Sequence, residues 1–242
     1  MTTTTLTTNQ QTIVAVAGVR KVYHQGRVEV KALDGISLTV AAGEFTALVG
    51  PSGSGKTTLL NLIGGLDVPD AGSITVAGRR LDTMSSAEVT RMRLESVGFV
   101  FQAYNLVPVL SALENVEYVM LLQGVGRAER RRRAEEVLEE VGLTGMYRRR
   151  PAEMSGGQQQ RVAVARAIAS NPAIVLADEP TANLDSHTAT ELLDLMREMN
   201  ARHHATFVFA THDELVMRYA RRIVRLRDGR VIEDERRDKS PV

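Results

Sequence analysis

A glycine-rich stretch has the residue types and the spacing needed to hold a chain of phosphates. Residues 50–58 read GPSGSGKTT and fit the pattern G-x-x-x-x-G-K-[ST]. The glycines let backbone N–H groups turn toward anionic oxygens, and the helix expected to begin near Gly55 adds its free N–H groups. Lys56 would reach the β- and γ-phosphates, and the Thr57 hydroxyl would bind Mg²⁺. The residues expected to contact a nucleoside triphosphate here are Gly50, Pro51, Ser52, Gly53, Ser54, Gly55, Lys56, Thr57 and Thr58.

The alternative for this stretch is an ordinary Gly/Ser loop between a strand and a helix. The preceding residues EFTALVG form a compact apolar run that ends at the loop, as a buried parallel strand does. This context favours the phosphate site.

A pair of carboxylates ends a second apolar run, AIVLADE. Ligands of open parallel sheets bind at the carboxyl ends of the strands. There Asp178 would hold Mg²⁺ through its water shell, and Glu179 would orient or deprotonate the attacking water. Without a phosphate loop such a pair is more often a helix cap, so the catalytic interpretation depends on that loop.

Two further strand-like runs end in polar side chains. His212 follows TFVFAT, and Gln102 closes VGFVFQ. His212 would sense the γ-phosphate, although a lone histidine is usually structural. Gln102 would bond the Mg²⁺ or the lytic water and report nucleotide occupancy to the residues that follow it.

The segment MSGGQQQR predicts a second anion-binding helix N-terminus. Ser155 precedes an apolar-periodic helix that carries Val162, Ala165 and Ala169. Two anion sites in one chain are explained if two copies pair head to tail, each lending this segment to the other's nucleotide. The alternative is a helix that serine merely caps. The residues expected to contact the partner's nucleotide are Ser155, Gly156, Gly157 and Gln158.

The surrounding pattern predicts how these residues are positioned. In the first third of the chain apolar and polar residues alternate, as they do in half-buried strands. Hairpins are expected at Ala77-Gly78 and later at Asp228-Gly229. Residues from about 85 to 169 are mostly helical in pattern. An apolar face at Ala134, Val137, Leu138 and Val141 marks one helix there, whose arginine run is expected to pair with glutamates rather than bind lipid or nucleic acid.

Composition sets the outer limits. The 242 residues are 43% hydrophobic and carry a formal net charge of +1, which gives no overall attraction to nucleic acid. Cysteine is absent, which excludes disulfides, thiolate metal sites and a cysteine nucleophile. No apolar run of about 18 residues exists, so no membrane span is expected. Residues 1–12 are expected to be a disordered leader and residues 233–242 a charged tail.

Together these motifs resemble the ATP-binding subunit of ABC transporters across nearly the whole chain. The matching segments are Gly50–Thr58, Gln102, SGGQ at Ser155–Gln158, ADEPT at Ala177–Thr181, NLD at Asn183–Asp185, and His212. The resemblance implies a P-loop ATPase of α/β class over residues 13–232. Its mostly parallel sheet would carry an N-terminal antiparallel β subdomain and an inserted helical subdomain at about 85–169.

The resemblance also implies roles and partners. Tyr23 would stack on adenine, although it could equally be a strand surface residue, and Asp185 would join the nucleotide contacts. The family implies ATP and Mg²⁺ as cofactors, a second copy as head-to-tail partner, and a position on the cytoplasmic face of a membrane through a separate permease. We expect the permease to dock at residues 103–113, with Tyr104, Leu106 and Val109 as surface anchors.

Longer sequence segments around these motifs indicate a branch of the family. KALDGISL, FVFQAYNLVPVLSALENV and LADEPTANLDS are similar to the lipoprotein-releasing and macrolide-exporting, LolD- and MacB-like, group. Met154 and Ala182 depart from the usual leucine and glycine of the family motifs. The alternatives are the ATPase of an amino-acid importer and a soluble ABC ATPase that acts on nucleic acid or ribosomes. Neither a second cassette nor a basic nucleic-acid face is apparent, so no nucleic acid is expected as a partner.

Overall fold

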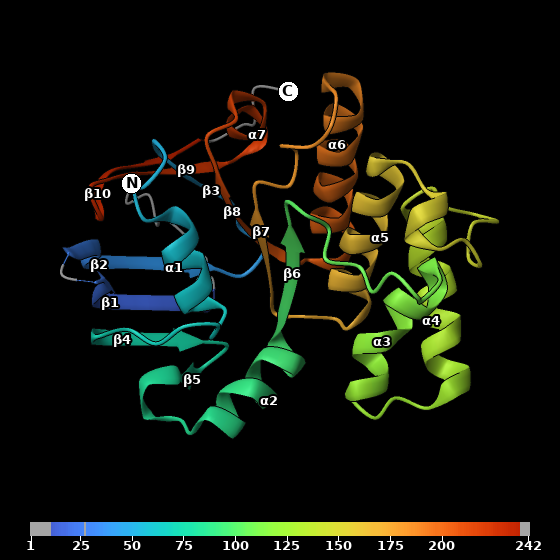
Figure 1. Ribbon diagram of the computed structural model, residues 1–242, viewed down its shortest axis with the longest axis horizontal. Helices are drawn as coiled ribbons and strands as arrows, with labels where there is room; N and C mark the ends of the chain where they lie inside the picture. The colour runs from blue at the N-terminus through green and yellow to red at the C-terminus, as the bar shows by residue number, and fades with distance from the viewer. Residues whose placement is uncertain (1–10, 27, 238–242) are drawn as a thin grey trace, which may run out of the picture.

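The computed structural model describes residues 11–26 and 28–237, and two sheets organise this part of the chain (Figure 1). The strands are β1 (Thr12–Gln25), β2 (Val28–Ala41), β3 (Phe45–Val49), β4 (Ala71–Val76), β5 (Arg79–Arg80), β6 (Val97–Phe101), β7 (Ile174–Asp178), β8 (Thr206–Thr211), β9 (Arg222–Arg227) and β10 (Arg230–Arg236). The helices are α1 (Lys56–Ile63), α2 (Ser86–Ser96), α3 (Ala112–Leu122), α4 (Arg127–Glu140), α5 (Gly156–Ala169), α6 (Ser186–His203) and α7 (Glu214–Tyr219), with short 3₁₀ turns at Leu81–Thr83 and Pro151–Glu153.

The larger sheet has the order β10-β9-β3-β8-β7-β6. All its neighbouring strands are parallel except the terminal pair β9 and β10. The smaller sheet, β2-β1-β4-β5, is antiparallel throughout. The predicted mostly parallel core with an antiparallel N-terminal sheet is therefore confirmed.

Both faces of the parallel sheet are covered, as the continuous apolar runs predict. In β8, Phe207 and Phe209 pack into the cluster formed with α3, α4, α5 and α6. The alternate residues Val208 and Ala210 pack into a second cluster with α1 and the antiparallel sheet. This two-sided packing fixes the strand ends at which the polar site residues lie.

The helical block differs from its expected range in one respect. Between 85 and 169, β6 interrupts the helices and pairs in parallel with β7 at the edge of the large sheet. After β6, helices α3, α4 and α5 pack against one another, and α4 buries the predicted residues Ala134, Val137 and Leu138. Its exposed arginines pair with glutamates one turn away, as expected.

The C-terminal hairpin also extends further than expected. Strand β10 runs to Arg236, so residues 233–236 of the expected charged tail belong to the sheet. The buried guanidinium of Arg222 binds Glu44 at 2.8 Å, Asp234 at 2.7 Å and the Thr39 carbonyl at 2.6 Å. These contacts join the hairpin to β2 and to the residue that precedes β3. Residues 1–10 of the expected leader and 238–242 of the tail lie outside the described residues, whereas Thr12 is already in β1.

Both predicted two-residue hairpin turns are confirmed. Ala77-Gly78 joins β4 to β5, and Asp228-Gly229 joins β9 to β10, each with positive φ at both turn residues. Among the described helices, none is long and apolar enough to cross a membrane.

Candidate active site

The phosphate loop lies between β3 and α1, and two of its glycines are required by contacts with other strands. A Cβ added at Gly50 would lie 2.2 Å from the Leu226 carbonyl oxygen of β9. At Gly55, where φ is 101°, an added Cβ would lie 2.5 Å from the Ala32 carbonyl oxygen of β2. The motif spacing therefore reflects close backbone approach from both sheets as well as conformational freedom.

Lys56 is the buried cation that the motif predicts. Lys56 is only 8% exposed, and its Nζ donates to the carbonyl oxygens of Gly50 at 2.8 Å and Pro51 at 3.0 Å. These contacts hold the ammonium group beneath the loop. Ser54 is also buried, and its hydroxyl has no partner among the described residues.

Thr57 and Asp178 meet although they are far apart in sequence. The Thr57 hydroxyl, on the first turn of α1, donates to Asp178 Oδ1 at 3.0 Å at the end of β7. Burial, and then the charge of Glu179, raise the pKa of Asp178, while Thr57 and Lys56 act in the opposite direction. The pair presents hydroxyl and carboxylate oxygens side by side.

Glu179 is held by the neighbouring strand β8. Its Oε2 accepts from Thr211 Oγ1 at 2.8 Å, and its Oε1 lies 2.7 Å from His212 Nδ1. Its backbone has a φ of 44°, and its N–H donates to the Ala210 carbonyl. The carboxylate is mostly buried, at 17% exposed, whereas the His212 side chain is 72% exposed. A tethered base beside an exposed imidazole is thus set at the carboxyl end of the sheet.

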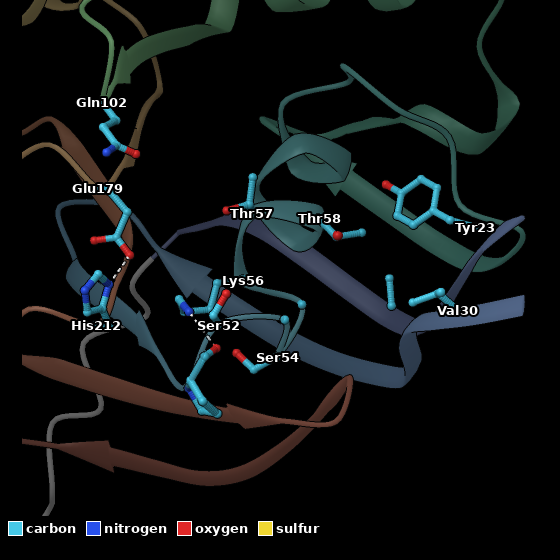
Figure 2. Close-up of a pocket in the computed structure, with 14 residues that line it drawn as sticks. Tyr23, Val30, Ser52, Ser54, Lys56, Thr57, Thr58, Gln102, Glu179 and His212 are labelled. Atoms are coloured by element: carbon cyan, nitrogen blue, oxygen red, sulfur yellow. Dashed lines mark hydrogen bonds and ion pairs between the residues drawn. The ribbon is translucent and has the colours of Figure 1, made fainter. Parts of the chain in front are cut away.

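Most of the predicted site residues line one cleft, which has a volume of about 550 Å³. Figure 2 shows this cleft and the residues that line it. Tyr23 and Val30 lie at one end, Lys56 in the middle, and Glu179, His212 and Gln102 at the other end. The predicted residues that line it are Tyr23, Pro51, Ser52, Gly53, Ser54, Gly55, Lys56, Thr57, Thr58, Gln102, Glu179 and His212. An elongated cleft with an aromatic ring at one end and a carboxylate at the other suits an extended nucleotide.

Tyr23 is fixed at its end of the cleft by a small polar cluster. Its hydroxyl donates to Asp67 Oδ2 at 2.7 Å, and Lys21 Nζ binds Asp67 Oδ1 at 2.8 Å while lying 5.2 Å from the centre of the Tyr23 ring. Burial and the Asp67 carboxylate, which accepts from the hydroxyl, raise the pKa of Tyr23. Tyr23 as a whole residue is 37% exposed, and it lines the cleft.

Sequence reasoning missed three residues of the site, namely Val30, Ala32 and Thr211. Val30 lines the cleft from β2, but an alternating strand carries no signal that one of its positions meets a ligand. Thr211 anchors Glu179, and its place as the last residue of an apolar strand run, directly before His212, was the available signal.

The segment Ser155–Gln158 does not line this cleft. Ser155 caps α5 as predicted: its hydroxyl accepts from the Gln158 N–H at 3.3 Å, and the Gln158 side chain accepts from the Ser155 N–H at 3.1 Å. A Cβ added at Gly157 would lie 2.5 Å from Thr188 Cγ2, and one added at Gly156 would lie 2.8 Å from the Tyr104 hydroxyl. The two glycines therefore allow close contact with α6 and with the segment after Gln102.

Asp185 also lies outside the cleft lining. It caps α6 by accepting from the N–H groups of His187 and Thr188, and the Thr188 hydroxyl lowers the pKa of its carboxyl. Within one chain, the phosphate loop, Asp178 and Glu179 are brought together, whereas Ser155–Gln158 and Asp185 stand apart from them.

The expected surface anchors after Gln102 are only partly exposed. Val109 is 71% exposed, but Leu106 packs against the helical core and Tyr104 is half-buried. Leu106 is partly buried against the helical core but keeps some exposed surface, so its role as a surface anchor stays a prediction.

Comparison with known proteins agrees with this geometry. The family model described as ABC transporter matches residues 33–182. The chain belongs to the ABC transporter family. It is an ATP-binding ATPase subunit, and its relatives include both LolD and MacB proteins. This family's cassette fold accounts for the two sheets and the helical insertion.

Three relatives illustrate the similarity. The lipoprotein-releasing system ATP-binding protein LolD of Anaeromyxobacter dehalogenans is 49% identical, covering 91% of this chain and 93% of that protein. The macrolide export ATP-binding/permease protein MacB of Sodalis glossinidius is 44% identical over 95% of this chain. The matched region makes up 35% of the length of that MacB protein. A dimeric ATP-binding cassette with ADP and Pi bound is 42% identical with a TM-score of 0.85, covering 92% of this chain and 98% of that one.

Proposed function

We propose that this chain binds MgATP between two head-to-tail copies of itself and drives a separate membrane permease of the lipoprotein-release or macrolide-export type. The ABC ATPase domain is assigned to residues 13–232, with a helical subdomain at about 85–169 that β6 interrupts. The proposed nucleotide contacts are Tyr23, the loop Gly50–Thr58, and, from the second copy, Ser155–Gln158 and Asp185. LolD and MacB relatives support the branch, and the amino-acid importer and nucleic-acid alternatives have no comparable support.

The observation that carries the proposal is the incomplete site within one chain. The cleft is lined by the phosphate loop with Lys56 and by Glu179, and Asp178 contacts Thr57 of that loop, yet the Ser-Gly-Gly-Gln helix end does not line the cleft. A second copy placed head to tail would bring that helix N-terminus and its dipole to the γ-phosphate. Relatives of known structure that are dimeric cassettes support this arrangement.

The donor set at the catalytic end fits Mg²⁺. Thr57 supplies a hydroxyl, Asp178 a carboxylate and Gln102 an amide oxygen, and magnesium prefers such hard oxygen ligands alongside waters and phosphates. When bound, the ion would neutralise charge on the β- and γ-phosphates. Proposed metal contacts are thus Thr57, Gln102 and Asp178.

The chain's own residues divide the remaining work. Lys56 leaves its carbonyl partners to meet phosphate oxygens, and Glu179 Oε1 or Oε2 accepts the proton of the attacking water. His212 holds Glu179 and, being exposed, also reaches the γ-phosphate side of the cleft. ATP drives closure because only the closed dimer adds the Ser155–Gln158 contacts, and a ligand shifts an equilibrium only by its difference in affinity.

The permease is proposed to dock in an apolar groove at the β6 edge of the large sheet. The groove, of about 620 Å³, is lined from α2, β6, α3 and α5, and it directly adjoins the segment after Gln102. Tyr118 and Leu122 present exposed apolar surface, at 43% and 55%. The charged residues of its lining are the arginines Arg93 and Arg166, which favours a partner segment that is apolar and acidic. Docking there would place the chain on the cytoplasmic face of the membrane.

The shared site is tested by mixing two inactive variants. Lys56→Ala and Ser155→Arg chains should each be inactive alone. Random mixing should restore about a quarter of parental ATPase activity, because half of the dimers are mixed and each of these has one complete site. Lys56→Ala mixed with Lys56→Ala,Ser155→Arg chains is the matched control, since that mixture forms no complete site. Background activity in the first mixture, with mixed dimers demonstrated, would place the whole site in one chain.

A further inference from the structure

Gln160 is a fully buried polar side chain on α5, two residues after the Ser-Gly-Gly-Gln segment. Its amide Nε2 donates to the Pro180 carbonyl at 2.7 Å and to the Phe101 carbonyl at 3.4 Å. The first bond is short and the second is at the long limit for such bonds. One amide therefore links the last residue of β6 to the segment that follows β7.

Both carbonyls belong to neighbours of proposed site residues. Phe101 directly precedes Gln102, and Pro180 directly follows Glu179. We infer that Gln160 is a positioning residue, which ties the glutamine at the metal and the glutamate at the lytic water to the helix that begins at Ser155. This inference rests on the roles proposed above for Gln102 and Glu179.

Further contacts show that α5 and the turn after β7 hold the segment after β6. The Asn183 amide donates to the Gln102 carbonyl at 2.9 Å. The Arg166 guanidinium, two turns along α5 from Gln160, donates to the carbonyls of Tyr104 at 2.9 Å and Asn105 at 2.5 Å. Tyr104 and Asn105 both have positive φ, a conformation that costs free energy in non-glycine residues and that these contacts maintain.

The chemistry of the side chain explains why an amide suits this position. Two carbonyl acceptors require two donors at one nitrogen, and the glutamine NH₂ supplies both. The Gln160 Oε1 is buried without a partner among the described residues, and an unpaired buried acceptor costs free energy of folding. Any favourable contribution of this amide to the structure therefore comes from its two N–H donors. An apolar side chain of the same length would leave the Pro180 carbonyl unpaired. As a consequence, Gln102 and Glu179 would be held less firmly in position, whereas the phosphate loop would not change.

The test compares Gln160→Met with Gln159→Met. Gln159 is the neighbouring glutamine on the same helix, but within the described part of the chain its amide donates only to the nearby Met154 carbonyl. Gln160→Met should lower kcat by at least about tenfold, because small displacements of reacting groups cost that much or more. It should also raise the Mg²⁺ concentration for half-maximal turnover, since Gln102 is displaced. The affinity for a fluorescent ATP analogue without Mg²⁺ should stay within about twofold of parental, as the loop and Tyr23 are untouched. Gln159→Met should match the parental chain in all three measurements.

A second variant keeps the inference testable if Gln160→Met fails to fold. Gln160→Asn retains the amide but is one methylene too short to reach both carbonyls, so it should show the same two shifts in milder form. Folded variants with parental kcat and Mg²⁺ dependence would overturn the inference. A loss of ATP affinity equal to the loss of kcat would also overturn it, because it would indicate general disruption. The proposed function is tested separately by the mixed-variant experiment, whose outcome does not depend on Gln160.

Discussion

Replacing Glu179 by glutamine separates catalysis from structure at this site. The carboxylate accepts from Thr211 with one oxygen and lies against His212 Nδ1 with the other. A glutamine in the same rotamer would keep both contacts: its oxygen would accept from Thr211, and its NH₂ would donate to His212 Nδ1 when the ring proton lies on Nε2. Only the negative charge and the basicity offered to water would be lost.

The expected magnitudes follow from that geometry. General base catalysis typically accelerates a reaction 10²–10⁴-fold, so the turnover rate should fall by about that factor. The fall corresponds to a loss of about 3–5 kcal/mol of transition-state stabilisation. Stability should change by no more than about 1 kcal/mol, the net worth of one altered hydrogen bond. ATP affinity should be retained, because the loop, Lys56 and Tyr23 are untouched.

The assay is single-turnover hydrolysis of radiolabelled ATP with enzyme in excess, together with thermal unfolding and gel filtration. With ATP and Mg²⁺ present, Glu179→Gln should accumulate as a dimer that the parental chain forms only transiently. Glu198→Gln, at a 58% exposed position on α6, is the matched control and should behave as the parental chain does. Hydrolysis by Glu179→Gln at the parental single-turnover rate would refute the assignment of Glu179 as the base.

Two further outcomes are expected. Leu122→Glu, in the apolar groove, should abolish both binding to membrane vesicles of the source cell and the effect of those vesicles on the ATPase rate, with basal ATPase activity unchanged. Ile232→Glu is the control, since Ile232 is similarly exposed at the opposite edge of the large sheet, and this variant should bind the vesicles normally. Equal binding by both variants would place the docking surface elsewhere. Asp234→Asn should destabilise the chain at neutral pH, because Arg222 lowers the pKa of Asp234 and so favours its charged form. The difference in unfolding free energy should therefore be full at pH 7. In urea titrations it should begin to shrink below about pH 4, the ordinary range of an aspartate, and vanish only below the lowered pKa of Asp234.

The sequence by itself determined the chemistry and most of the elements that carry it. The spacing of Gly50, Gly55 and Lys56 predicted the loop because few other uses require that combination, and apolar runs ending in Asp178 or His212 predicted parallel strands with polar ends. Ser155 as a helix cap followed from local capping chemistry, which needs no tertiary information. The hairpin turns were predictable for the same reason.

Tertiary structure decided which of these residues meet and what holds them. Thr57 and Asp178 are 121 positions apart and touch only because α1 packs over the strand that ends at Asp178. Leu106 is partly buried because it packs against the helical core, which its neighbours in sequence do not reveal. Gln160 reads as the third residue of a glutamine run, yet its partners are two backbone carbonyls brought together by the parallel order of β6 and β7. Backbone acceptors are the same at every residue, so no side-chain pattern can show which carbonyls will lie within reach of a buried amide.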